Sequence, residues 1–112
     1  MIDNESDLLA MMKDLLEEEG FQAFCAENGT DGIRLNERKN PDLIVLDLRM
    51  PEMDGIETLR QIRKKDDKVK VVILTGYGSP DIIRDASDLN VSKYLSKPFE
   101  NEELIRVFRE II

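Results

Sequence analysis

The segment from Pro41 to Gly55 limits the possible folds of this chain more than any other part of it. Leu43 to Leu46 is an unbroken apolar run rich in β-forming residues, which predicts a strand buried on both faces, as in a parallel sheet. Asp47 ends the run, and ligands bind at the carboxyl ends of such strands. Asp47 is therefore a candidate nucleophile or metal ligand, and the alternative is an aspartate that only caps the following loop.

The rest of the chain alternates between helical and strand patterns, which predicts a parallel α/β sheet. Apolar residues at helical spacing predict the helices, and β-branched runs predict the strands. Gly20 is expected to end the first helix in the left-handed conformation, and Ser79 to cap the helix that starts at Pro80. The predicted helices are 6–19, 30–40, 56–65, 80–89 and 100–111, and the predicted strands are 21–26, 43–47, 69–75 and 91–95.

Composition restricts the function classes. The 112 residues predict one domain, residues 1–112, and the net charge of −8 argues against direct contact with nucleic acid. We find no apolar run long enough to span a membrane and no signal peptide, and the lone Cys25 suits a reducing cytoplasm. The chain has no histidine, which excludes imidazole catalysis and a phosphohistidine of its own.

Chemically useful side chains follow several of the predicted strands. Asp3 comes just before the first helix, Asp47 and Thr75 end two strands, and Lys97 follows a third. Because parallel strands share one rim, these residues are expected to converge. Two carboxylates can hold Mg²⁺, and an ammonium and a hydroxyl can contact a transferring phosphoryl group.

Together these motifs resemble the receiver domain of two-component response regulators, of the chemotaxis-regulator type. The resemblance implies a flavodoxin-like, doubly wound parallel sheet with strand order 2-1-3-4-5. It further implies Asp47 as the phosphoacceptor, Lys97 and Thr75 as contacts of the phosphoryl group, and Thr75 and Tyr94 as switch residues. The implied Mg²⁺ ligands are Asp3, Asn4, Asp47 and the backbone carbonyl of Arg49. The matching segments are Asp3-Asn4-Glu5, Asp47 to Gly55, Leu74-Thr75-Gly76 and Tyr94 to Phe99.

The implied function is to accept a phosphoryl group from a histidine kinase or phosphotransfer protein and to signal to a downstream protein through a switched surface. The domain would not be an enzyme. A phosphatase that forms an aspartyl phosphate would need an acid where Arg49 stands, and Gly76-Tyr77-Gly78 lacks the features of a nucleotide-binding loop. The remaining alternative is a degenerate receiver that binds a partner without phosphorylation.

Two departures from the family pattern favour that alternative. The family's usual second acid is Asn4 here, so a metal ion would meet one negative charge fewer. Only Met1 and Ile2 precede Asp3, where the family has a central strand of about five apolar residues. A truncated start, a rearranged sheet and a homodimer that supplies the missing pairing are the three explanations, because unpaired strand edges favour association.

Overall fold

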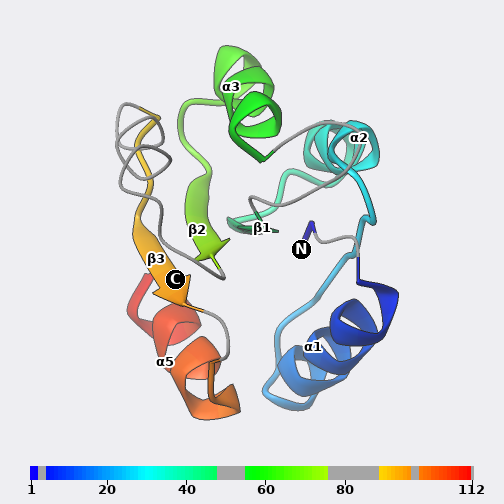
Figure 1. Cartoon of the computed structure of the whole chain (residues 1–112), viewed down its shortest axis with the longest axis vertical. Coiled ribbons are helices and arrows are strands. Elements are labelled where there is room, and N and C mark those ends of the chain that lie inside the picture. The colour runs from blue at the N-terminus through cyan, green and yellow to red at the C-terminus, as the bar shows by residue number, and fades with distance from the viewer. Residues whose placement is uncertain (3–4, 48–54, 76–88, 97–98, 112) are drawn as a thin grey trace.

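The computed structural model describes residues 1–2, 5–47, 55–75, 89–96 and 99–111 (Figure 1). Its helices are α1 (Ser6–Glu18), α2 (Gly29–Lys39), α3 (Gly55–Lys65) and α5 (Asn101–Ile111), and its strands are β1 (Leu43–Asp47), β2 (Lys70–Thr75) and β3 (Lys93–Ser96). These elements confirm the predicted alternation of helices and strands. Most of their ends lie within one or two residues of the predicted ends. The predicted helix 80–89 and its Ser79 cap lie outside the described residues, apart from Leu89.

The strands form a parallel sheet in the order β1-β2-β3. Leu43 of β1 pairs with Lys70 of β2, and Val72 of β2 pairs with Lys93 of β3. The first four residues of β1 are all apolar, and side chains on both faces of the strand are covered. This confirms the parallel α/β class.

Helices α2 and α3 lie on one face of the sheet, and α1 and α5 lie on the other (Figure 1). Alternate strand residues point to opposite faces, so Val71 and Ile73 pack with α3, whereas Val72 and Leu74 pack with α1 and α5. On one side, the buried apolar residues of α3 are Leu59 and Ile62. On the other side, the helices bury Met12 and Leu16 of α1 and Leu104 and Val107 of α5. The fold is therefore doubly wound, as expected.

Met1 and Ile2 take the place of a central strand. Ile2 forms parallel bridges with both Ala26 and Leu46. Its N–H donates to the Val45 carbonyl at 2.8 Å, and the Asp47 N–H donates to the Ile2 carbonyl at 2.9 Å. The two residues thus preserve the expected order of a first strand between the second and third, but over a very short length. The sheet is not rearranged in the described part of the chain.

The prediction of a strand at residues 21–26 is wrong. Within this segment only Ala26 forms a bridge, while residues 21–25 have no regular secondary structure. The Ala26 N–H donates to the Met1 carbonyl at 2.9 Å, and the Met1 ammonium donates to the Phe24 carbonyl at 2.8 Å. A strand needs a ladder partner along its length, and Met1–Ile2 supplies one only at the end of the segment.

Local signals set the helix ends. The Asn28 side chain accepts a hydrogen bond from the Asp31 N–H at 2.9 Å, so α2 begins at Gly29, one residue earlier than predicted. Gly20 follows α1 with φ +93°, which confirms the predicted left-handed residue. No helix in the described ranges is long and apolar enough to cross a membrane.

Candidate functional site

Asp47 is the last residue of β1, and it is only 4% exposed. A carboxylate in such a position loses most of its hydration, so it is retained only where it has partners or a function. Its backbone N–H is fixed by the Ile2 carbonyl, which ties the end of β1 to the first described residues of the chain. The structure therefore places a buried carboxylate at the carboxyl end of β1.

The three strand ends meet at one edge of the sheet, as the sequence predicts. Asp47 is in register with Leu74, and Leu74 with Leu95. Thr75, the last residue of β2, is in register with Ser96, the last residue of β3. The arrowheads of β2 and β3 accordingly point to the same end of the molecule (Figure 1). Residues distant in the sequence are thus brought to a common rim.

Several predicted site residues lie outside the described residues. They are Asp3, Asn4, Arg49 and Lys97. Asp3 directly follows Ile2 in the sequence and Lys97 directly follows Ser96, and both of these neighbours are placed in the sheet. Among the described residues, no cluster of three Asp, Glu, Cys or His side chains could hold a metal ion. The described part of the site therefore contributes Asp47 and the backbone of Thr75.

Tyr94 lies in β3, in register with Ile73 of β2. Its half-buried ring packs against the apolar cluster between the sheet and α2 and α3. Burial disfavours the phenolate and raises the pKa of Tyr94, so the hydroxyl stays protonated at neutral pH. The sequence thus located correctly an aromatic residue near the strand end. Its role as a switch is not tested by this position.

Sequence reasoning missed the role of Arg63, at the end of α3. Its guanidinium donates to the backbone carbonyls of Val69 at 2.7 Å, Leu89 at 2.8 Å and Asn90 at 2.8 Å. A longer bond of 3.3 Å reaches the Asp66 carbonyl. Arg63 thereby fastens the chain that enters β2 to the chain that leads to β3. Backbone acceptors leave no trace in the sequence, so no motif could have revealed this contact.

Asp66 shapes the same turn. Its carboxylate accepts from the N–H groups of Lys68 at 3.0 Å and Val69 at 3.1 Å. Burial raises the pKa of Asp66, but these bonds, the Asn36 amide and the nearby Arg63 charge outweigh it, so the pKa falls below its usual value. For Arg63, burial lowers the guanidinium pKa, opposed by the charges of Asp66 and Asp67. The feature of the sequence that could have indicated this turn is the pair Asp66-Asp67, which directly follows the basic end of α3.

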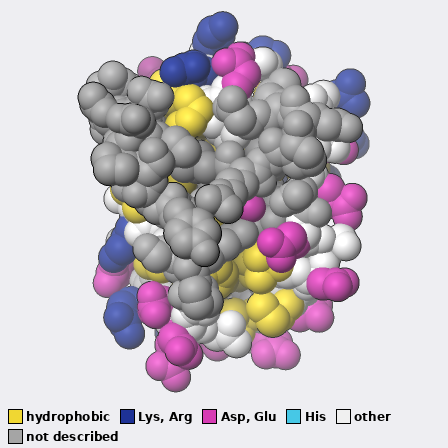
Figure 2. Space-filling view, viewed as in Figure 1, with side chains coloured by type: hydrophobic (Ala, Val, Ile, Leu, Met, Phe, Trp, Pro, Cys, Tyr) yellow, Lys and Arg dark blue, Asp and Glu magenta, His cyan; other side chains and the backbone are white. Residues whose placement is uncertain are grey.

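The surface carries the excess of negative charge expected from the composition. In the face shown in Figure 2, acidic side chains gather along the right and lower edges, whereas Lys and Arg side chains lie mainly along the top and at the left. Most of the described ion pairs are exposed and long, such as Lys13 with Glu17 at 3.9 Å, and contribute little to stability.

Comparison with known proteins agrees with this geometry. Residues 1–109 match the family model described as "Response regulator receiver domain". Over 104 residues the chain is 32% identical to sporulation initiation phosphotransferase F of Bacillus subtilis, covering 93% of this chain and 84% of that protein. It is also 32% identical to the regulatory protein AtoC of Escherichia coli, of which it covers only 23%.

The solved structures give the same result. The response regulator receiver domain protein from Clostridium thermocellum superposes with a TM-score of 0.90 at 33% identity, covering 99% of this chain and 90% of that one. A family-model match over nearly the whole chain, a buried aspartate at the end of β1 and aligned strand ends all agree. The chain belongs to the response regulator receiver domain family of two-component systems.

Proposed function

We propose that Asp47 is the phosphoacceptor of this receiver domain. The observation that carries the proposal is the buried Asp47 carboxylate at the end of β1. This strand end is aligned with the end of β2, which is Thr75, and with the end of β3, which directly precedes Lys97 in the sequence. The backbone of Asp47 is fixed in the sheet by its hydrogen bond to the Ile2 carbonyl, which would position the carboxylate for in-line attack. Because the chain has no histidine, the phosphohistidine that supplies the group belongs to a partner, either a histidine kinase or a phosphotransfer protein.

In the transfer, a carboxylate oxygen of Asp47 attacks the phosphorus and forms a new P–O bond. The P–N bond to the partner imidazole breaks, and the ring nitrogen keeps the electron pair and later takes a proton. The chain is the acceptor in this reaction and not an enzyme. The Lys97 ammonium and the Thr75 hydroxyl would contact the phosphoryl oxygens and offset their charge.

The donor set of the proposed site suits Mg²⁺. Asp47 offers a buried carboxylate, and Asp3, the Asn4 amide and the Arg49 carbonyl would complete a set made only of oxygen atoms. When bound, the ion would neutralise charge on the phosphoryl group. The Asn4 amide would coordinate the ion without a charge, so we expect weaker metal binding than with two acids at these positions.

Signalling would follow from a change at Thr75 and Tyr94. Tyr94 packs half-buried against the α2 and α3 side of the sheet. Once Thr75 contacts the phosphoryl group, repacking of Tyr94 would change the surface offered to a downstream protein. We place this protein in the cytoplasm, with residues 1–112 acting as one domain and with no direct contact to nucleic acid.

Intact-mass spectrometry after incubation with acetyl phosphate and Mg²⁺ tests the proposal. We expect the mass of one phosphoryl group to be added to the wild-type chain and to Asp42→Asn, but not to Asp47→Asn. Asp42 is a matched control because it is an exposed aspartate just before the same strand. Labelling of Asp47→Asn to the wild-type extent would overturn the assignment. An inert wild-type chain would instead support a receiver that acts without phosphorylation.

A further inference from the structure

The charges of this chain are unevenly divided between its two helical layers. Helices α2 and α3 carry more Lys and Arg than Asp and Glu, whereas α1 and α5 carry more Asp and Glu than Lys and Arg. Figure 2 shows Lys and Arg side chains along the top of the molecule, where Figure 1 places α2 and α3. A chain with a net charge of −8 therefore has one positive layer.

The acidic residues of the positive layer are already compensated. Every acidic residue of α2 and α3 has a cation within ion-pair distance, and the pairs are Asp31–Arg34, Glu37–Lys65 and Glu57–Arg60. Lys39 lies over the Phe24 ring at 5.1 Å. Other exposed cations at the ends of these helices and in the chain entering β2 form no ion pair with any described residue: Arg38, Lys64, Lys68 and Lys70. We call these four residues the basic face.

The basic face lies at the end of the molecule opposite Asp47. The ion pair between Lys65 and Glu37 joins the last turns of α2 and α3, which carry two members of the face. The other two members lie in the turn after α3 and at the first residue of β2, where β1 also begins. Asp47 is at the other end of β1. A partner bound to the basic face would thus leave the Asp47 rim open.

The helix dipole does not account for this arrangement. Cations in the last turn of a helix are favourable, which explains Arg38 and Lys64. Lys68 and Lys70 lie beyond the end of α3, where this effect has faded. Moreover, α1 has no basic residue in its last turn, so cations are not placed at every helix end of this chain. They gather on one layer.

A groove next to the basic face can receive an apolar side chain. It has a volume of about 380 Å³ and lies where β1 and β2 begin. Pro41, Val69 and Ile111 contribute apolar lining, and Lys68 and Lys70 are part of the same lining. The groove therefore offers an apolar contact and two cations to the same ligand.

Two carboxylates also line the groove, and they differ in how well they are compensated. Asp66 accepts from the backbone N–H groups of Lys68 and Val69, and the buried Asn36 amide approaches it at 3.5 Å. The Asn36 Oδ1 accepts no hydrogen bond within the described ranges. Asp66 is thus compensated from inside the protein. Asp42 is exposed and would oppose an incoming anion.

We propose that the basic face and its groove bind a short acidic segment of a partner protein, with one apolar side chain in the groove and carboxylates beside the cations. Screening at physiological salt limits the attraction to about 8 Å, so a short segment meets the basic face alone. A long polyanion such as a nucleic acid would also meet the acidic layer of α1 and α5, which repels it. This inference is independent of phosphorylation at Asp47.

An NMR titration with the peptide acetyl-Glu-Asp-Leu-Glu-Asp-carboxamide tests the proposal. We expect saturable shifts of the Lys68, Val69 and Lys70 amides. The neutral peptide acetyl-Gln-Asn-Leu-Gln-Asn-carboxamide should bind about tenfold more weakly, because the charge pairs are lost. An acidic peptide with alanine in place of leucine should bind about fivefold more weakly, because less apolar surface enters the groove. Shifts confined to residues around Asp47 would overturn the proposal.

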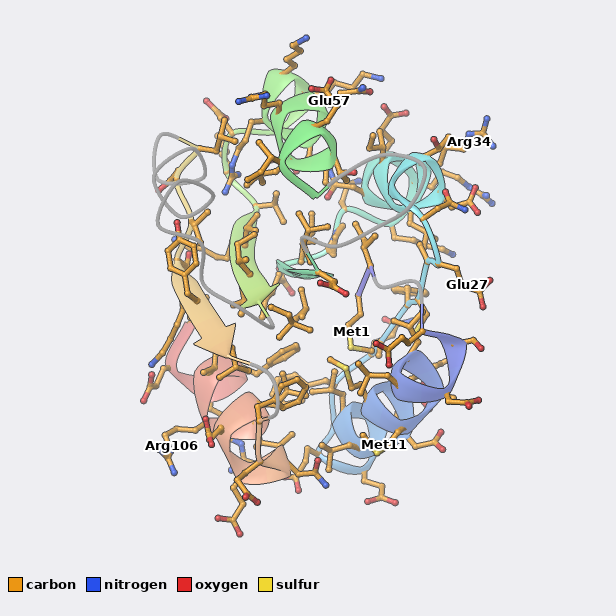
Figure 3. All side chains as sticks on the ribbon, in the orientation of Figure 1. Met1, Met11, Glu27, Arg34, Glu57 and Arg106 are labelled. Carbon is orange, nitrogen blue, oxygen red and sulfur yellow. The ribbon has the colours of Figure 1, made fainter. Side chains whose placement is uncertain are left out.

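Protein variants separate the basic face from an effect of net charge. The double variant Lys64→Glu with Lys68→Glu should weaken binding about tenfold, and its neutral counterpart with Gln at both positions about threefold. Lys13→Glu with Arg106→Glu is the matched control, since it reverses two exposed cations of the other layer, and Figure 3 shows Arg106 across the sheet from α3. Asp42→Asn should strengthen binding about twofold. Equal weakening by both reversal variants would show that only net charge matters and would overturn the proposal.

Other occupants of the basic face give different results. Tighter binding of a short DNA duplex than of the acidic peptide, lost in the Lys64→Glu with Lys68→Glu variant, would identify a nucleic-acid surface and refute the proposal. Self-association of the protein alone, removed by the same variant, would show that the acidic layer of a second copy occupies the face. Absence of acidic-peptide binding at low salt would refute the proposal outright.

Discussion

Removing the Arg63 guanidinium tests how the ends of the sheet are held in place. In Arg63→Met, four carbonyl groups lose their donor: those of Asp66, Val69, Leu89 and Asn90. The methionine keeps most of the apolar stem, so the loss is mainly of hydrogen bonds. A net contribution of about 0.5–1 kcal/mol per bond gives a destabilisation of about 2–4 kcal/mol. The melting temperature should fall by about 10–20 °C.

Urea unfolding followed by far-UV circular dichroism measures this loss, since the chain has no tryptophan for fluorescence. Arg60→Met is the matched control on the same helix, because Arg60 makes only a 3.9 Å ion pair with Glu57 and is 51% exposed. It should cost less than about 0.5 kcal/mol. Arg63→Lys should fall between the two, because a lysine cannot reach all four carbonyls at once. Equal midpoints for Arg63→Met and Arg60→Met would refute the reasoning.

Two further predictions concern the first residues of the chain. A Cβ on Gly32 would overlap the Ile2 side chain, with Cγ1 at 2.7 Å and Cδ1 closer still, so Gly32→Ala should destabilise the fold by about 1–3 kcal/mol. The penalty should disappear in an Ile2→Ala background, and an additive double-mutant cycle would contradict the contact. The second prediction concerns pH. Burial lowers the pKa of the Met1 amine from 8.0, so the folded state binds fewer protons, and stability should rise with pH up to about 8. Urea midpoints between pH 6.5 and 8.5 measure this rise. A chain acetylated at Met1 should not show it. The series is best measured in a Cys25→Ser background, because burial raises the pKa of the Cys25 thiol and its titration opposes the rise near pH 8.5.

The sequence predicted the elements with strong local patterns. The continuous apolar run located β1 to the residue, and Asp47 was found buried at its end. The prediction failed at residues 21–26, where the composition favours a strand but Met1–Ile2 is too short to pair with it. Strand formation depends on a partner elsewhere in the chain, and local propensity cannot report whether that partner is long enough.

The candidate site could be predicted only in part. Alignment of the strand ends follows from parallel topology, so the convergence of Asp47 with the end of β2 was foreseeable. The assignments of Asp3, Asn4, Arg49 and Lys97 still rest on the family resemblance, because these residues lie outside the described part of the chain. The Arg63 contacts and the unpaired Asn36 oxygen arise from tertiary packing and have no local signature.

The position of Met1 also affects how the protein should be produced for experiments. Its ammonium donates to the Phe24 carbonyl at 2.8 Å, and the next residue, Ile2, bridges Ala26 and Leu46. An affinity tag fused directly before Met1 would disturb the bridges that Ile2 makes with Ala26 and Leu46. Tag position would thus alter the property being measured. A tag at the carboxyl end, following α5, leaves this part of the sheet undisturbed.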